Sequence, residues 1–496
     1  MVIELIAARM LAPYIGVSLY TWTSIIGVIL AGIALGNYLG GKVADRFASP
    51  AVLAIVFFAG SLATIAILPI IKVAAPATWF SNMSVMLNFV TKVLCIFFLP
   101  AIILSMVSPM VIKLTLADLG QTGGIVGTIY ACSTVGSILG TFMTGFYFIL
   151  WLGTRMIVWL VVAILILMGI LVWFSWKSPG RWHLSLKNLI MWITIIAVIT
   201  TSAIIFQFRE CWQESYTRES NYYAIQVEDE YNAKILRLDR LVHGYIVPDV
   251  RILHDYLEIF AKIVGYVTTE NGTPRVLHLG GGGYSFPRYM EVVYPGSINE
   301  VVEIDPAVTE VAYEELGLPR ETSIKTYNQD ARLFLIQRKT EKKYNIVIGD
   351  VFNDLSTPYH LTTLEFDKLV KANMEEDGIY LFNIIDDYKR GRYMPSVIYT
   401  LRQVFNNVYV FSRRQDPWLF EGRGTFIVAA TDRQIDLTQY KEFVTKGASE
   451  TAYGHLAGFP ISEAKLREYL TERKPLLLTD DYAPTDILAV LLPGGG

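Results

Sequence analysis

The stretch RVLHLGGGGYSFPRYM, residues 275–290, decides the fold of the second half of this chain. A short apolar run leads into four consecutive glycines, and a helical pattern follows them. Glycine lacks a Cβ atom, so it lets the backbone adopt positive φ and approach a ligand closely. The stretch therefore predicts a strand, a bare turn and a helix, and it makes Gly280, Gly281 and Gly282 candidate ligand-binding residues.

Short apolar runs separated by helical patterns continue from this stretch toward the C-terminus. The predicted strands are RVLHLGG, INEVVEID, KYNIVIGDV and GIYLFNII, and the predicted helices are RYMEVVY, AVTEVAYEEL and ARLFLIQRK. Such alternation is typical of βαβ units, so we expect an α/β Rossmann-like domain over 249–496. Upstream, YYAIQVED and AKILRLDRLVHG alternate in polarity and predict a small antiparallel β unit over 209–248.

Acidic residues follow successive predicted strands. Glu303 ends the strand about 20 residues beyond the glycines, where an acid can bind both ribose hydroxyls. Asp330 follows the third strand and Asp350 ends the fourth. Ligands of parallel sheets bind at the carboxyl ends of the strands, so we expect these acids to lie along one edge. For any one of them, a solvated loop acid is the plain alternative.

The glycine sequence of the turn indicates which class of nucleotide it could bind. The chain has no GxxxxGK[ST] motif, which excludes a P-loop. GGGGYSF lacks the last glycine of GxGxxG, so a dinucleotide is less favoured. A nucleoside held through ribose and adenine fits better, and S-adenosylmethionine or a derivative is such a ligand. The predicted fold is thus of the S-adenosylmethionine-dependent transferase type. For the glycine stretch itself, the alternative is a tight turn that binds no ligand.

The first half of the chain has another composition. Hydrophobic residues make up 53% of the 496 residues, yet the chain is mostly apolar up to about Phe206 and ordinary after Arg209. A membrane helix needs about 20 apolar residues, and such stretches lie near 22–41, 51–71, 86–112, 124–150, 156–174 and 189–206. With the opening segment, read as a short or truncated helix, they predict a multi-pass helical membrane domain over 1–208 with about seven spans.

Small residues on the predicted spans indicate close helix packing. Glycines lie four residues apart at Gly32, Gly36 and Gly40, and again at Gly136 and Gly140. A transport path is the alternative reading of these faces. Polar residues that could mark such a path are Asn88, Lys92 and Lys113, although the two lysines can equally snorkel from helix ends.

Basic residues also bear on orientation. Lys42 and Arg46 follow the second span, Lys113 follows the fourth, and Lys177, Arg181 and Lys187 follow the sixth. The positive-inside rule assigns these loops to the cytoplasm, and seven spans would then put the second half outside. Because that half would use a cytoplasmic metabolite, we expect it in the cytoplasm, attached to the cell membrane.

Composition also restricts cofactors and partners. The net charge is −3 and no Lys/Arg block suggests a nucleic-acid partner. The three cysteines form no CxxC or Cys/His cluster, so we expect no metal. The expected partners are a small-molecule substrate and the lipid bilayer, and a homodimer is left open.

Taken together, VLHLGGGG, VVEIDPAV, NQDARLFL and YNIVIGDVFND resemble the spermidine synthase family of polyamine aminopropyltransferases. LDRLVHGY and LHDYLEIF resemble the entry segment of that family. AARMLAPYIG, GNYLGGKVADR and LTDDYAPTDIL resemble its membrane-fused branch. The resemblance covers nearly the whole chain, and its motifs are specific as a set.

The resemblance implies an activity and residue roles. The family transfers the aminopropyl group of decarboxylated S-adenosylmethionine to an amine such as putrescine, and methylthioadenosine leaves. Asp350 would be the catalytic aspartate, because an amine with a pKa of about 10.4 is protonated at pH 7 and a group of the site must accept its proton. Donor contacts would be His243, Glu303 for the ribose, and Asp330 with Ala331 for the adenine. Amine contacts would be His254 and Asp354, with Pro358 and Tyr359 in a covering loop. Ordinary satisfied histidines are the alternative for His243 and His254.

Gly283 departs from the family, which has an aspartate at this position to bind the ammonium of the decarboxylated donor. A charged hydrogen bond is worth about 1.5–3 kcal/mol, so a change of donor is energetically reasonable. Three hypotheses remain: a membrane-anchored aminopropyltransferase of polyamine biosynthesis, a methyltransferase that uses intact S-adenosylmethionine, and a non-catalytic transporter or sensor that binds a nucleoside or polyamine.

Overall fold

The computed structural model divides the chain into two compact units, unit 1 over 1–224 and unit 2 over 225–496. The predicted division at 208 and 248 stays a prediction. The residues that the structure describes are 1–15, 19–75, 85–116, 122–175, 217–253, 256–268, 273–338, 342–352, 357–413, 416–419, 421–447 and 458–489.

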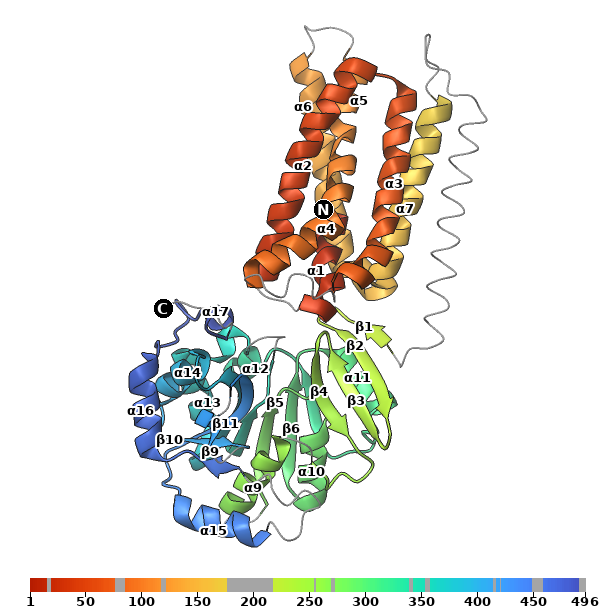
Figure 1. The fold of residues 1–496 in the computed structure, drawn as a ribbon. Coiled ribbons are helices and arrows are strands. Elements are labelled where there is room, and N and C mark those ends of the chain that lie inside the picture. Colours follow the sequence, from red (N-terminus) through yellow and green to blue (C-terminus); the bar gives the residue numbers. More distant parts are fainter. Residues whose placement is uncertain are drawn as a thin grey trace. The chain divides into compact units, whose positions relative to one another are not determined.

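Unit 1 consists mainly of long helices (Figure 1). They are α1 (Val2–Ile15), α2 (Leu19–Phe47), α3 (Pro50–Ala74), α4 (Val85–Ser105), α5 (Val107–Thr115), α6 (Thr122–Met143), the π-helix η2 (Thr144–Phe148) and α7 (Ile149–Ser175), followed by the strand β1 (Thr217–Glu219). Within the described residues, five helical segments are long and apolar enough to cross a membrane. They coincide with five of the predicted spans, while the span predicted at 189–206 lies outside the described residues.

The glycine face of α2 packs closely against α4 and α5. A Cβ atom on Gly32 would lie 2.7 Å from the Cβ of Ala101, and one on Gly40 would lie 2.7 Å from the Cα of Met106. This face therefore allows the helix backbones to approach each other, as small residues do in membrane bundles. Gly136 on α6 has open space around it among the described residues.

The two lysines of the apolar helices both have partners. Lys92 is 8% exposed, and its Nζ donates to the carbonyl of Ala75 at the end of α3, at 2.6 Å. Lys113 pairs with Asp45 at 2.9 Å. Each ammonium is thus held by a neighbouring helix, and these contacts supply structural roles for both side chains.

Unit 2 begins with a small antiparallel sheet, as predicted. β2 (Ala224–Glu230) pairs with β3 (Ala233–Leu238), and β3 pairs with β4 (Leu241–Ile246). The alternation of buried and exposed side chains that suggested these strands appears in β2, where Ile225 and Val227 are buried.

The large sheet of unit 2 has eight strands in the order β12-β10-β11-β9-β8-β5-β6-β7. Its strands are β5 (Arg275–Leu279), β6 (Ile298–Glu303), β7 (Lys325–Asn328), β8 (Tyr344–Gly349), β9 (Met374–Asp387), β10 (Asn407–Ser412), β11 (Arg423–Thr431) and β12 (Phe459–Pro460). β5 to β9 run parallel, while β10 and β11 are antiparallel additions. The chain proceeds from β5 through β6 to β7 on one side and then returns to β8 on the other. This reversal is the switch point at which such sheets bind ligands.

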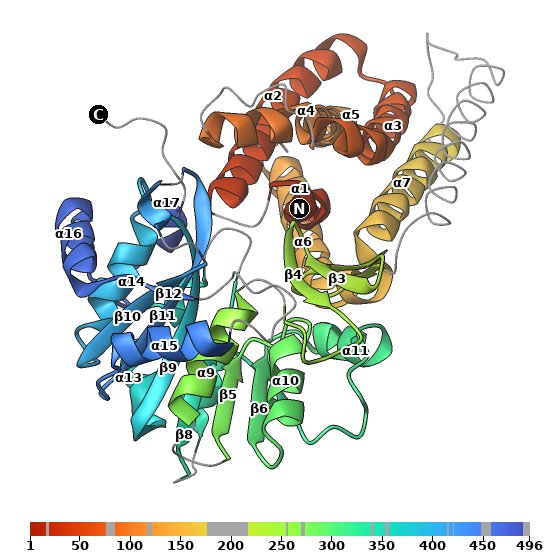
Figure 2. The same cartoon turned by 60° about the horizontal axis from the view of Figure 1, so that its bottom comes forward.

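Helices cover both faces of this sheet (Figures 1 and 2). The helices and 3-10 turns are α9 (Leu257–Thr268), α10 (Ser285–Val293), α11 (Pro306–Glu314), α12 (Ala331–Gln337), η3 (Tyr359–Leu361), α13 (Leu364–Ala372), α14 (Tyr393–Leu401), η4 (Pro417–Leu419), α15 (Leu437–Gly447), α16 (Glu463–Arg473) and α17 (Thr485–Ala489). The predicted Rossmann-like fold and the small β unit are confirmed.

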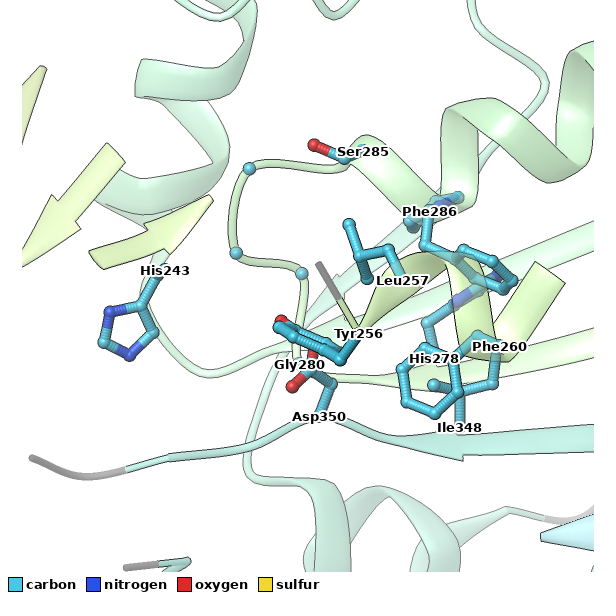
Figure 3. A pocket seen from close by; sticks show the side chains of 14 residues that line it. His243, Tyr256, Leu257, Phe260, His278, Gly280, Ser285, Phe286, Ile348 and Asp350 are labelled. Atoms are coloured by element: carbon cyan, nitrogen blue, oxygen red, sulfur yellow. The ribbon is translucent and has the colours of Figure 1, made fainter. Parts of the chain in front are cut away.

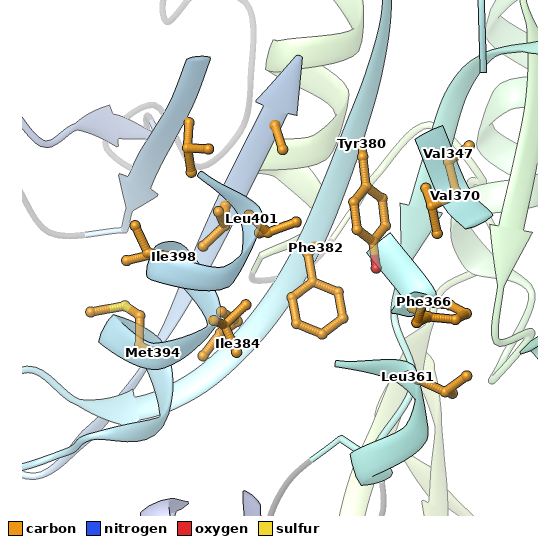
Figure 4. Packing of buried hydrophobic residues seen from close by; sticks show 14 of the residues in the cluster. Val347, Leu361, Phe366, Val370, Tyr380, Phe382, Ile384, Met394, Ile398 and Leu401 are labelled. Carbon is orange, nitrogen blue, oxygen red and sulfur yellow. The ribbon is translucent and has the colours of Figure 1, made fainter. Parts of the chain in front are cut away.

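Strand β9 shows how the two faces are divided. Tyr380, Phe382 and Ile384 alternate along the strand and pack with α13 and α14 in one core (Figure 4). Ile379 and Leu381 belong to the opposite core, with α9, α10 and α15. Because the middle of β9 is covered on both faces, its run from Gly378 to Ile385 is almost continuously apolar, as expected of a buried parallel strand.

Candidate functional site

The glycine turn after β5 fits tightly against the chain that follows β8. Gly280 has a φ of +93°, and a Cβ atom there would lie 3.1 Å from the carbonyl carbon of Asp350 and closer still to its oxygen. Gly282 also has a positive φ, of +47°. A residue with a Cβ atom is thus disfavoured at Gly280 both by conformation and by space.

The predicted acid at the end of β6 faces this turn. Glu303 is 6% exposed, and its Oε2 accepts hydrogen bonds from the backbone N–H of Gly281, at 2.8 Å, and of Gly282, at 3.3 Å. Its Oε1 accepts from the N–H of Asp305 at 3.0 Å. Burial raises the pKa of the Glu303 carboxyl, and the backbone hydrogen bonds oppose that rise.

Asp350, the predicted catalytic residue, follows β8 and is held by two side chains. Tyr256 Oη donates to its Oδ2 at 2.7 Å, and Asn383 Nδ2 donates to its Oδ1 at 2.9 Å. Burial raises the pKa of the Asp350 carboxyl, while the two hydrogen bonds lower it. A carboxylate with a raised pKa is a stronger base than one in water, and it keeps a defined orientation here.

A pocket joins the glycine turn to Asp350 (Figure 3). Figure 3 shows Tyr256 beside Asp350, with His243 standing apart from them. The lining residues are His243, Tyr256, Leu257, Phe260, His278, Gly280, Gly281, Gly282, Gly283, Ser285, Phe286, Pro287, Ile348 and Asp350. Aromatic and aliphatic side chains of α9, α10 and β8 thus form one wall, and polar groups form the other.

Both histidines of the pocket are uncharged at neutral pH. Burial lowers the pKa of His278 to about 4, and its Nε2 lies 3.2 Å from Asn299 Oδ1. Burial also lowers the pKa of His243, whose Nδ1 lies 3.1 Å from the carbonyl of Leu241. Among the described lining residues, Asp350 is therefore the single acidic side chain, and the two histidines of the pocket are neutral.

Asp330 lies at another place along the sheet edge. It caps α12 by accepting from the N–H of Leu333 at 2.9 Å, and its Oδ2 lies 2.9 Å from His360 Nε2. The hydrogen bond from His360 is the largest cause that lowers the pKa of Asp330. Asp330, Ala331 and Glu303 do not line the pocket described above.

The structure therefore brings some predicted residues together and leaves others apart. His243, Gly280, Gly281, Gly282 and Asp350 line one pocket. Tyr359 is 57% exposed in η3 and precedes His360, the hydrogen-bond partner of Asp330. His254 and Asp354 fall outside the described residues. The site roles of all these residues stay predictions.

Several residues of the site were not predicted from the sequence, and three of them contact or adjoin Asp350 and the glycine turn. Tyr256 lies in the quoted segment LHDYLEIF, but nothing in the sequence links it to β8. Asn383 carried a usable signal, because it is a polar residue in the apolar run GIYLFNII. Ile246 at the end of β4 lies over the turn, with its Cδ1 2.8 Å from where a Cβ on Gly283 would be.

The C-terminal motif LTDDYAPTDIL supports the sheet edge. Asp480 forms a two-point ion pair with Arg332 of α12, at 2.7 and 2.5 Å, and accepts from Thr363 Oγ1 at 2.7 Å. Arg332 also donates to the carbonyl of His360 at 3.1 Å. The motif thus fixes α12 and η3, which carry Asp330 and its histidine partner.

Comparison with known proteins gives relatives that match part of the chain. No family model matches. A polyamine aminopropyltransferase of Vibrio vulnificus is 26% identical over 217 residues, which are 43% of this chain and 69% of that protein. A probable polyamine aminopropyl transferase of Bifidobacterium longum is 26% identical over 221 residues, 42% of this chain and 48% of that protein. An N-terminal histidine N-methyltransferase of Emericella nidulans is 27% identical over 165 residues, 32% of this chain and 29% of that protein.

The chain thus spans about two thirds of the Vibrio relative and about half of the Bifidobacterium one. These relatives confirm the predicted likeness to spermidine synthase-type aminopropyltransferases, which are transferases. The membrane fusion is suggested by the long apolar helices of unit 1. In the part of the chain that the structure describes, no group of three or more His, Cys, Asp or Glu side chains could hold a metal ion.

Proposed function

We propose that this chain is a membrane-anchored aminopropyltransferase of polyamine biosynthesis. It would move the aminopropyl group of decarboxylated S-adenosylmethionine to an amine such as putrescine. The observation that carries the proposal is the oriented, partly buried carboxyl group of Asp350 beside a bare glycine turn, in a pocket whose described lining holds no other acidic side chain. The aminopropyltransferase relatives support the reaction class.

The reaction is a displacement at carbon. The amine nitrogen attacks the methylene carbon next to the sulfonium, a C–N bond forms, and the C–S bond breaks with its electron pair going to sulfur. Methylthioadenosine leaves, and Asp350 takes the proton that the nitrogen must lose. A raised pKa suits this role, because general bases work best when their pKa lies near the working pH.

The donor-binding roles in this proposal follow the sheet edge. Glu303 accepts a hydrogen bond from a ribose hydroxyl beside the turn, and the turn itself lets the donor approach the backbone. Asp330 and Ala331 bind the adenine, and His243 contacts the donor from β4. The amine-binding set in this proposal is His254, Asp354 and Tyr359.

Location is part of the proposal. The five apolar helices of unit 1 span the cell membrane, and unit 2 faces the cytoplasm, where the donor is made. Protease added to sealed right-side-out vesicles should then leave unit 2 intact, and protease added to inverted vesicles should remove it. Removal from right-side-out vesicles would refute this orientation.

Methyl transfer from intact S-adenosylmethionine is the second candidate. Two observations favour it: Gly283 provides no carboxylate for the ammonium of a decarboxylated donor, and one relative is an N-methyltransferase. A donor with its carboxylate in place would meet no acidic side chain at position 283. A binder that consumes neither donor is the third candidate.

Product analysis with the full-length protein in detergent separates these candidates. With decarboxylated donor and putrescine we expect methylthioadenosine, whereas S-adenosylhomocysteine from the intact donor would identify a methyltransferase. Asp350→Asn should lower turnover by about 10²–10⁴-fold, the usual contribution of a general base. Asp436→Asn, which alters an acid that caps α15, serves as control and should keep activity. Consumption of neither donor would refute both enzymatic candidates.

A further inference from the structure

Asn383 is a buried amide on the sheet face that forms the apolar wall of the pocket. It is 1% exposed and lies two residues after Leu381 on β9, so both side chains point to the same face. Leu381 packs in one core with Phe260 and Ile348, which line the pocket. An amide in such surroundings needs hydrogen-bond partners, because a buried polar group without one costs about 1–3 kcal/mol.

The amide has a partner on one side. Its Nδ2 donates to Asp350 Oδ1 at 2.9 Å. An ionised carboxylate can only accept hydrogen bonds, so the amide must turn its nitrogen toward Asp350. Its Oδ1 is therefore directed elsewhere, and this buried oxygen has no hydrogen-bond partner among the described residues. A strong acceptor thus lies next to the catalytic carboxylate.

The needs of an attacking amine match this pair of acceptors. A neutral primary amine has one lone pair and two N–H groups. The lone pair must point at the donor carbon, and one N–H must reach Asp350, which takes its proton. The second N–H is left over, and Phe260, Phe286 and Ile348 of the pocket wall carry no side-chain atom that could accept it.

We propose that Asn383 Oδ1 binds the second N–H of the attacking amine, which makes Asn383 a substrate-binding residue that selects primary amines over N-methylated ones. This inference rests on the proposed function. After attack the nitrogen carries two hydrogens, one of which passes to Asp350 while the other stays bound to Asn383. A methyl group in place of that hydrogen leaves the buried oxygen without a donor.

The alternative is that Asn383 only orients Asp350 through its Nδ2. The two roles give different results when the amine is varied. A positioning role predicts that Asn383→Leu weakens reaction with every amine by the same factor. A binding role predicts that the variant loses the preference for primary amines as well, because only the wild-type oxygen distinguishes N–H from N–CH₃.

The experiment uses the full-length protein in detergent with 1,4-diaminobutane and its N,N′-dimethyl derivative. We expect wild type to favour the primary diamine by at least 10-fold in kcat/KM, and Asn383→Leu to reduce this ratio to within about twofold of one. Asn383→Gln keeps an amide and should retain part of the preference. Thr431→Val replaces a buried polar group that donates to Gly378 on the same sheet, and it should leave the ratio unchanged.

Calorimetric binding of the two diamines in the absence of donor provides a readout that needs no turnover. A preference for the primary diamine that disappears in Asn383→Leu would support the inference even if aminopropyl transfer failed. Equal losses for both diamines would overturn it and leave Asn383 as a positioning residue. A wild type that binds neither diamine would overturn the inference together with the proposed function.

Discussion

Gly280→Ala is the change that tests most directly whether the turn and Asp350 depend on each other. At a φ of +93°, any residue other than glycine is strained, by about 1–2 kcal/mol. The new Cβ would also lie 3.1 Å from the carbonyl carbon of Asp350 and closer to its oxygen. Backbone atoms yield less readily than side chains, so we add the usual cost of overpacking, about 1–3 kcal/mol. The expected loss in the free energy of unfolding is about 2–5 kcal/mol, the sum of the strain and the overpacking.

Gly422→Ala is the matched control. Gly422 has a φ of +88°, but a Cβ there would have open space around it among the described residues. Its substitution should cost only the conformational strain, about 1–2 kcal/mol. The difference between the two variants therefore isolates the clash with Asp350.

Hydrogen exchange of the β5 and β8 amides in the full-length protein in detergent measures both losses, because such central strands exchange through the largest openings. Gly280→Ala should also disturb the hydrogen bond between Tyr256 and Asp350, so it should reduce turnover further than Gly422→Ala does. Equal losses of stability in the two variants would refute the argument that the turn is packed against Asp350.

Two further predictions concern other parts of unit 2. Gly283→Asp should lower the stability of the fold by about 1–3 kcal/mol, because Ile246 occupies the space that the new side chain needs. Combined with Ile246→Ala, it should cost less than the sum of the two single changes. Stability losses that are fully additive, measured by hydrogen exchange, would contradict this prediction. Burial raises the pKa of Asp386 to about 6, so the folded state holds an extra proton between about pH 4 and 6, and stability should fall by about 3 kcal/mol as pH rises through that range. Asp386→Asn should remove this slope in denaturation curves at pH 4.5 and 7.5, and a slope that persists would show that another group causes it.

Periodicity and turn chemistry predicted the Rossmann-like half well. The strand that ends at Leu279, the glycine turn and the helix that begins at Ser285 follow from local patterns, because each residue type favours its own backbone conformation. The helices of unit 1 could also be predicted, since a membrane-spanning helix needs a long uninterrupted apolar stretch. Five of them are helices long enough to cross.

Contacts between distant segments could not be predicted in the same way. Tyr256 meets Asp350 across 94 residues of chain, and Arg332 meets Asp480 across 148. Such pairs depend on how the strands are ordered in the sheet, which local patterns do not encode. Ile246 illustrates the same point, because its place over Gly283 depends on the packing of β4 against the turn.

The hydrogen bonds from the glycine turn to Glu303 have a consequence for ligand affinity. The flexible glycine backbone is already ordered by a carboxylate of the same chain, so its entropy is lost during folding and not during binding. A nucleoside that donates one hydroxyl hydrogen to Glu303 would meet a backbone that is already ordered. Association would then require little rearrangement, and the affinity would depend mainly on the contacts that the ligand itself forms.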